Sequence, residues 1–169
     1  DDPVIMDEIT ERLRAWNTDL IARYEAKVLA DPADSESAVD LAWCYMQNDQ
    51  PDKALAVAET SDEAAADPFD YNNLYGKLYH NIQMYAEAAE HMEKVVAILR
   101  TMVPDGTEKT DKRILRLPEM LQILGNCLMQ TGEQERAMDV FAEALALAPD
   151  DVNVLTMMGK IHFSVGEYE

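Results

Sequence analysis

Hydrophobic residues recur every three or four positions along most of the chain, which is the period of an amphipathic helix. Residues 118 to 149 show it best, with apolar or small residues at Leu121, Leu124, Cys127, Leu128, Ala137, Phe141, Ala144 and Leu145. Thr131-Gly132 interrupts the pattern and Pro149 ends it, as expected of a turn and a helix terminus. This stretch is therefore predicted to be a pair of short antiparallel helices.

The same pattern recurs in other parts of the chain. Ala54 and Ala88 are 34 residues apart, Ala137 follows 49 residues after Ala88, and Leu155 lies 34 residues after Leu121. A repeated unit of this length indicates stacked helical hairpins rather than a single globular core. We predict repeats at 35–68, 69–102 and 118–151, an insertion at 103–117, and the first helix of a truncated repeat at 152–169.

The N-terminal residues 1–34 depart from this organisation. Their apolar residues continue without a break and predict one long amphipathic helix from about Val4 to Ala30, namely Ile5, Ile9, Leu13, Trp16, Leu20 and Tyr24. Its latter half is expected to pack as a cap or half repeat. The alternative is a helix that packs elsewhere or pairs with a partner.

These residues resemble the tetratricopeptide repeat family, a helix-turn-helix of 34 residues. The third repeat carries most of the family pattern, in Leu124, Gly125, Gly132, Ala137, Phe141, Ala144 and Pro149. The second carries Gly76, Tyr79, Tyr85 and Ala88. The resemblance implies an all-α, right-handed superhelical solenoid of antiparallel helix pairs. It also implies a concave groove lined by the first helix of each pair.

The groove positions of the family, transferred to this chain, give candidate peptide-binding residues. His80 also occupies one of these positions. The candidates are Trp43, Met46, Asn73, Lys77, Asn81, Gln122, Asn126, Met129, Lys160 and Phe163. Amide side chains both donate and accept hydrogen bonds, so they can bind the backbone of an extended peptide. Trp43 and Phe163 are the expected apolar anchors. The alternative is that the amides solvate an empty surface.

The charge of the chain narrows the choice of partners. It has 33 acidic against 14 basic residues and a net charge of −19, which argues against nucleic acid. No apolar run reaches the roughly 18 to 20 residues that cross a bilayer, so we expect a soluble chain without direct membrane insertion. Cytoplasmic and exported locations both remain open. Cys44 and Cys127 lack the spacing of a zinc site, and no cofactor motif is present.

The insertion at 103–117 is the one basic segment. Its candidate docking residues for an acidic partner are Lys109, Lys112, Arg113 and Arg116. Asp111 is a plausible N-cap for a helix that begins at Lys112. The alternative is that these cations tether the insertion to the acidic body through salt bridges.

No nucleophile or metal-protease motif appears, and the three histidines are interpreted as solvated or capping residues. The sequence therefore predicts a non-catalytic scaffold that binds a protein, as a peptide or a partner helix. The alternative is a structural or regulatory segment of a larger enzyme or secretion assembly. Because Gly166 to Glu169 match the start of a second helix, we also expect a fragment of a longer protein. Its last helix would then have an apolar face that is exposed or buried in a homodimer.

Overall fold

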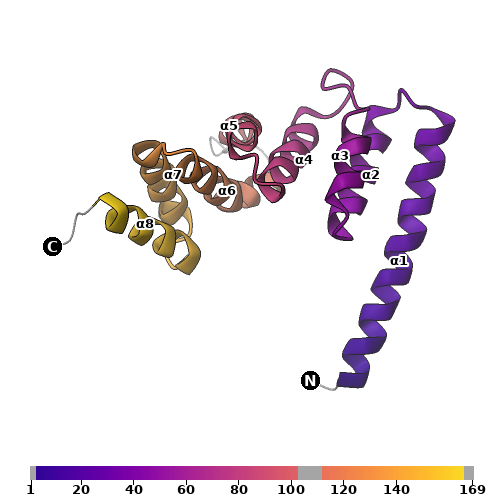
Figure 1. Cartoon of the computed structure of the whole chain (residues 1–169), viewed down its shortest axis with the longest axis horizontal. Helices are drawn as coiled ribbons and strands as arrows, with labels where there is room; N and C mark the ends of the chain where they lie inside the picture. Colours follow the sequence, from indigo (N-terminus) through magenta and orange to yellow (C-terminus); the bar gives the residue numbers. More distant parts are fainter. Residues whose placement is uncertain (1–2, 103–111, 166–169) are drawn as a thin grey trace. The chain divides into compact units, whose positions relative to one another are not determined.

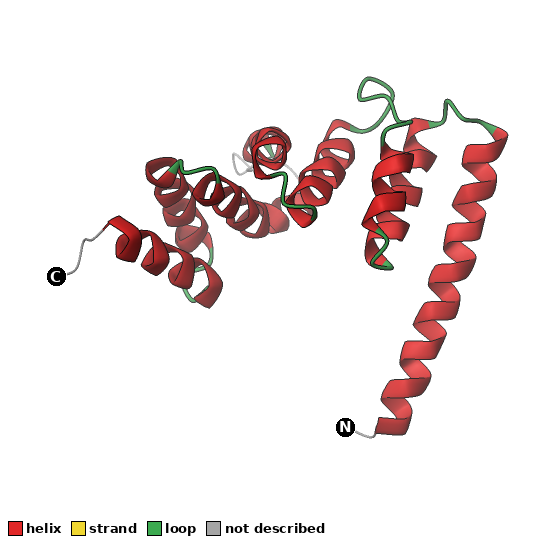
Figure 2. Cartoon of the chain, viewed as in Figure 1, coloured by secondary structure: helices red, strands yellow, loops and turns green. Residues whose placement is uncertain are grey.

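The computed structural model describes residues 3–102 and 112–165, and all regular elements in these ranges are helical (Figure 2). The elements are α1 (Pro3–Ala30), α2 (Ser35–Gln47), α3 (Pro51–Ala58), α4 (Pro68–Asn81), α5 (Tyr85–Thr101), the 3-10 helix η1 (Lys112–Arg116), α6 (Leu117–Gln130), α7 (Gln134–Leu147) and α8 (Val152–Val165). The predicted all-α fold class is confirmed. The chain forms two compact units, Asp1–Leu74 and Tyr75–Glu169, whose boundary falls within α4.

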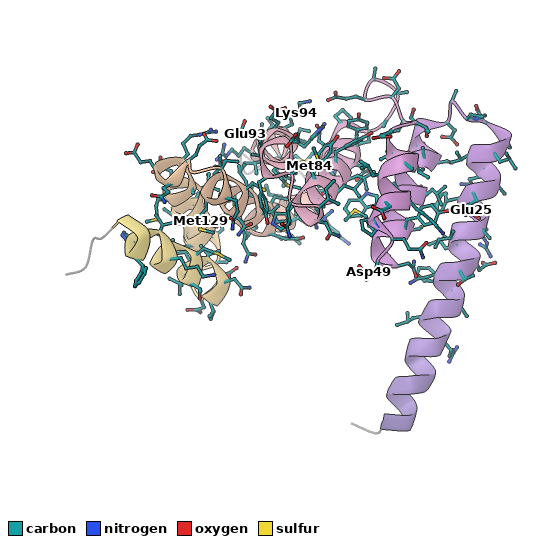
Figure 3. All side chains as sticks on the ribbon, in the orientation of Figure 1. Glu25, Asp49, Met84, Glu93, Lys94 and Met129 are labelled. Carbon is teal, nitrogen blue, oxygen red and sulfur yellow. The ribbon has the colours of Figure 1, made fainter. Side chains whose placement is uncertain are left out.

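The first unit contains the predicted long helix. The C-terminal part of α1 packs against α2, where Tyr45 Oη donates a hydrogen bond of 2.5 Å to Glu25 Oε1 (Figure 3). Burial and this hydrogen bond raise the pKa of Tyr45 to about 12. Towards its N-terminus α1 extends beyond the α2–α3 hairpin (Figure 1), and Leu13 and Trp16 are 55% and 60% exposed. The apolar face of α1 is therefore covered only in part within this unit.

Aspartates account for several helix starts, which explains part of the acidic composition. Asp34 Oδ1 accepts a hydrogen bond from Ser37 N at 3.0 Å, and Asp67 Oδ1 accepts one from Phe69 N at 2.9 Å. Asp151 Oδ1 accepts one from Val154 N at 3.1 Å. These caps satisfy amide groups that lack a partner within the helix. Helix α6 instead follows η1 directly and begins with Pro118 near its first position.

One backbone motif recurs in the turns that join α2 to α3, α4 to α5 and α6 to α7. Asp49, Gln83 and Gly132 all have positive φ, at 56°, 64° and 87°. The next residue in each turn donates a hydrogen bond to a carbonyl five positions earlier, as in Gln50 N to Tyr45 O at 3.0 Å, Met84 N to Tyr79 O at 2.8 Å and Glu133 N to Leu128 O at 2.8 Å. This is the Schellman arrangement that ends helices. Only the third turn has the residue that tolerates it best, glycine.

We expect Gln83→Gly to raise the free energy of unfolding by about 1 kcal/mol, because a left-handed conformation costs an L-residue roughly that much. Asp49→Gly should raise the free energy of unfolding by a smaller amount, since aspartate tolerates positive φ better than glutamine. Gly132→Ala should lower the free energy of unfolding by about 1 kcal/mol, because the positive φ strains an alanine. A steric clash does not add to this cost, since no heavy atom beyond the chain neighbours lies within 4 Å of the added Cβ. Urea denaturation followed by circular dichroism measures all three. A loss of stability in Gln83→Gly would contradict this account.

Close helix contacts in the second unit depend on glycine opposite a large side chain. A Cβ at Gly76 would lie 2.4 Å from Met92 Cε, and one at Gly125 would lie 2.5 Å from Phe141 Cε1. Met92 and Phe141 are fully buried. The absence of a side chain at each glycine thus lets α4 approach α5 and α6 approach α7 closely at these points.

The C-terminal part of the insertion is described from Lys112 onwards, where η1 contacts α5 and α6. Arg116 Nε lies 3.8 Å from Glu119 Oε2, an ion pair that ties η1 to α6. Lys112 is exposed and Arg113 is half-buried. The candidates Lys109 and Asp111 lie outside the described residues. Across the described ranges, no helix has both the length and the hydropathy to cross a membrane.

Candidate peptide-binding surface

The second unit contains a hollow formed by α4, α6 and α8. It has a volume of about 260 Å³ and is lined by His80, Gln122, Ile123, Asn126 and Met157. Each lining residue comes from the first helix of a predicted repeat. This is the face that the sequence predicted to bind a peptide, and Gln122 and Asn126 were both predicted for it.

A short polar chain crosses this hollow. His80 Nε2 lies 3.0 Å from Asn126 Oδ1, within hydrogen-bond distance, and Asn126 Nδ2 is directed at Met157 Sδ at 3.8 Å. The His80 ring also meets the edge of Tyr85, with ring centroids 5.8 Å apart. Asn126 is therefore fixed from two helices. An amide held in this way has both a donor and an acceptor available to a ligand if the sulfur contact is exchanged.

An ion-pair cluster borders the hollow. Lys77 Nζ lies 2.5 Å from Glu119 Oε1, and Glu119 also pairs with Arg116. Lys77 is therefore bound to Glu119 and joins α4 to α6 rather than presenting an unpaired cation. A partly exposed pair of this kind contributes little to stability, but it fixes the charge pattern beside the hollow. Arg116 belongs to this cluster through a local pair with Glu119, three residues later in the sequence.

The remaining candidates of the second unit do not line the hollow. Asn81 and Lys160 are exposed, and Phe163 on α8 is 69% exposed. Met129 on α6, labelled in Figure 3, is half-buried. The structure therefore brings Gln122 and Asn126 together in one hollow and leaves these four residues outside its lining.

Three candidates belong to the first unit. Trp43 and Met46 on α2 are half-buried. Asn73 on α4 is only 1% exposed, and its Oδ1 has no hydrogen-bond partner. A buried amide oxygen without a partner carries a desolvation cost, so Asn73 is placed within the fold rather than on an open surface.

Sequence reasoning missed two residues of the hollow and underrated a third. Ile123 and Met157 lie 34 residues apart in the same column of the repeat, one position after the Gln122 column. This column could have been included, since it lies three residues before the Asn126 column, and residues three apart share a helix face. His80 was interpreted as solvated or capping, whereas the structure places it in the hollow beside Asn126.

The hollow is lined by amide, imidazole and apolar side chains rather than by carboxylates or thiols. The described residues include no group of three or more His, Cys, Asp or Glu that could hold a metal ion. Burial raises the pKa of the Cys127 thiol to about 11, so this cysteine stays protonated near neutral pH. The arrangement of amides, one imidazole and two apolar side chains suits recognition by contact and hydrogen bonding.

The fold and this surface define a class of protein, the helical-hairpin repeat proteins that act as interaction modules. Three sequence-family models described as tetratricopeptide repeat match the chain, at residues 21–78, 69–98 and 118–161. Together they span most of it. The chain belongs to the tetratricopeptide repeat family.

Solved structures agree with this fold. A crystal structure of MamA has a TM-score of 0.71 and 16% sequence identity, with 93% of this chain and 83% of that chain covered. A second MamA structure has a TM-score of 0.71 and 17% identity, with 97% of this chain and 82% of that chain covered. No curated protein matches the sequence. At this level of identity the likeness concerns the fold.

Proposed function

We propose that this chain is a non-catalytic scaffold that binds an extended peptide, or a partner helix, over the hollow between α4, α6 and α8. The observation that carries the proposal is the convergence of two amide side chains and His80 on one hollow with apolar walls. Ligand sites commonly combine apolar walls with a few placed polar groups. Trp43 and Met46 in the first unit and Phe163 in the second remain predicted peptide contacts.

The chemistry of the hollow favours contact with a peptide backbone. Gln122 and Asn126 each offer a donor and an acceptor, which a peptide bond can satisfy whatever its side chain. Ile123 and Met157 provide an apolar wall, and methionine adapts to ligands of different shape. The nearby cation Lys77 is already paired with Glu119, so we expect a ligand without a strong requirement for acidic residues.

Selection from a random twelve-residue peptide library on the immobilised chain tests this proposal. The affinity of a selected peptide is then measured by fluorescence anisotropy for the wild type and for Asn126→Leu. Because the variant removes both hydrogen-bonding groups but keeps a similar volume, we expect binding at least tenfold weaker.

Glu90→Ala is the matched control, since Glu90 is exposed on α5, which does not line the hollow. It should bind the selected peptide as the wild type does. Selected peptides that bind Asn126→Leu and Gln122→Leu with unchanged affinity would show that the ligand lies elsewhere, and the proposed site would be wrong.

A further inference from the structure

The side-chain amide of Asn126 is held in one orientation in the hollow. Its Oδ1 lies 3.0 Å from His80 Nε2 of α4, and its Nδ2 lies 3.8 Å from Met157 Sδ of α8. The two contacts differ in kind, because the oxygen of an amide accepts hydrogen bonds and its nitrogen donates them. The orientation of this amide therefore decides which of its groups a ligand meets.

The sulfur contact fixes the direction of the amide. A thioether sulfur is a weak acceptor and has no hydrogen to donate. It therefore pairs with the amino group of Asn126, whereas a reversed amide would set the carbonyl oxygen against the lone pairs of the Met157 sulfur. Since Oδ1 then faces His80, the hydrogen of this second bond comes from the imidazole.

His80 is consequently the donor of its bond to Asn126. The atom within hydrogen-bond distance of Oδ1 is Nε2, so the neutral ring carries its proton there, and a protonated ring would donate from the same atom. The edge contact with Tyr85 of α5, at an interplanar angle of 73°, supports the ring from a third helix. Tyr85 and His80 thus set the direction of the amide before a ligand binds.

This arrangement makes the amino group of Asn126 the part that gains most from a ligand. A carbonyl oxygen that replaces the Met157 sulfur accepts a stronger hydrogen bond than the thioether does. A ligand N–H would instead share Oδ1 with His80, which already donates to this oxygen, and would gain less. The hollow therefore favours a hydrogen-bond acceptor at this point.

We propose, on the basis of the proposed function, that His80 is a positioning residue that fixes Asn126 as a hydrogen-bond donor, and that Asn126 binds a main-chain carbonyl oxygen of the peptide. A main-chain carbonyl fits because Ile123 and Met157 form an apolar wall beside Asn126, which disfavours a charged side chain.

NMR of the imidazole nitrogens tests the role of His80 without a ligand. In the ¹⁵N-labelled 169-residue chain, the chemical shifts of the ring nitrogens report which one carries the proton, and the loss of these signals in His80→Gln assigns them. We expect the proton on Nε2. A ring with its proton on Nδ1 and none on Nε2 would mean that Asn126 donates to the imidazole, and the proposal would be wrong.

Two variants separate positioning from packing. The probe is a twelve-residue peptide selected on the chain, and its affinity is measured by fluorescence anisotropy. His80→Phe keeps a ring beside Tyr85 but lacks the donor, so we expect binding at least fivefold weaker. His80→Gln places an N–H near the position of Nε2 and should bind within about twofold of the wild type. If His80→Gln binds no better than His80→Phe, the imidazole acts by packing alone and the positioning role is wrong.

Asn126→Asp tests the direction of the contact with the peptide. It replaces the amino group by a second acceptor oxygen at nearly the same volume, so we expect binding at least tenfold weaker. Asn153→Asp is the matched control, because it adds the same charge at an exposed position of α8 that does not line the hollow, and its affinity should be unchanged. Unchanged or tighter binding by Asn126→Asp would show that Asn126 accepts a hydrogen bond from the peptide.

Peptides that each contain one thioamide locate the carbonyl group. Sulfur is a weaker acceptor than oxygen, while a thioamide N–H is the stronger donor. At one position we expect binding to the wild type at least fivefold weaker and binding to Asn126→Asp unchanged. If no position responds in this way, the acceptor is not a main-chain carbonyl.

The proposed function and this orientation of Asn126 can fail separately. If Asn126→Leu leaves the affinity unchanged, the hollow is not the peptide site and the proposed function is wrong. If Asn126→Leu weakens binding but Asn126→Asp does not, the hollow remains the site and only the donor role of Asn126 is rejected.

Discussion

Phe141→Ala is expected to lower the free energy of unfolding by about 4 kcal/mol, the usual cost of truncating a fully buried phenylalanine. Phe141 is 0% exposed, and its ring lies directly over Gly125 between α6 and α7. The alanine would leave a cavity at the centre of the third repeat, because no side chain at Gly125 can fill it. Urea denaturation monitored by circular dichroism gives the change.

A double-mutant cycle with Gly125→Ala tests the cause. Alone, Gly125→Ala should cost about 2 kcal/mol, since three ring carbons of Phe141 lie 2.5 to 2.9 Å from the added Cβ, and overpacking outweighs the better helix propensity of alanine. In the Phe141→Ala background the same change should be neutral or stabilising. Gly159→Ala, which meets no neighbour within 4 Å, serves as the control and should stabilise. Additive effects of the two substitutions would contradict a direct contact.

Asn73→Leu is expected to raise the free energy of unfolding by about 2 kcal/mol, because it removes a buried hydrogen-bond acceptor whose desolvation cost is not offset by a hydrogen bond. Asn73 is 1% exposed, its Oδ1 has no partner, and leucine has a similar volume. The measurement is the urea midpoint, followed by the fluorescence of Trp16 and Trp43 in the same unit.

Asn72→Leu is the matched control on the adjacent residue. Asn72 Nδ2 donates a hydrogen bond of 2.8 Å to Pro68 O, so its loss should destabilise rather than stabilise. If Asn73→Leu also destabilises, Asn73 makes a polar contact that contributes to folding, and the explanation based on a partnerless oxygen is wrong. If Asn73→Leu stabilises the fold but weakens peptide binding, Asn73 contributes to binding at the expense of stability.

Helix positions and turns could be predicted from the sequence because they depend on local patterns. The spacing of Leu121, Leu124 and Leu128 defines one face of a helix whatever surrounds it, and Gly132 and Pro149 restrict the backbone directly. The same register places Gly125 opposite Phe141, a contact that the structure contains. The long helix α1 was predicted for the same reason, since its apolar period has no interruption.

The tertiary structure decided which predicted side chains face a ligand, because burial and pairing depend on neighbours far away in the sequence. Lys77 looked like an available cation, but Glu119, 42 residues later, pairs with it. Asn73 looked like a groove residue, but it is buried. His80 and Asn126 are 46 residues apart, and only the packing of α4 against α6 brings them together. By itself, then, the sequence determined the family, the helices and their turns, since these follow from local periodicity. Only tertiary packing decided the composition of the hollow, because it depends on contacts between residues far apart in the sequence.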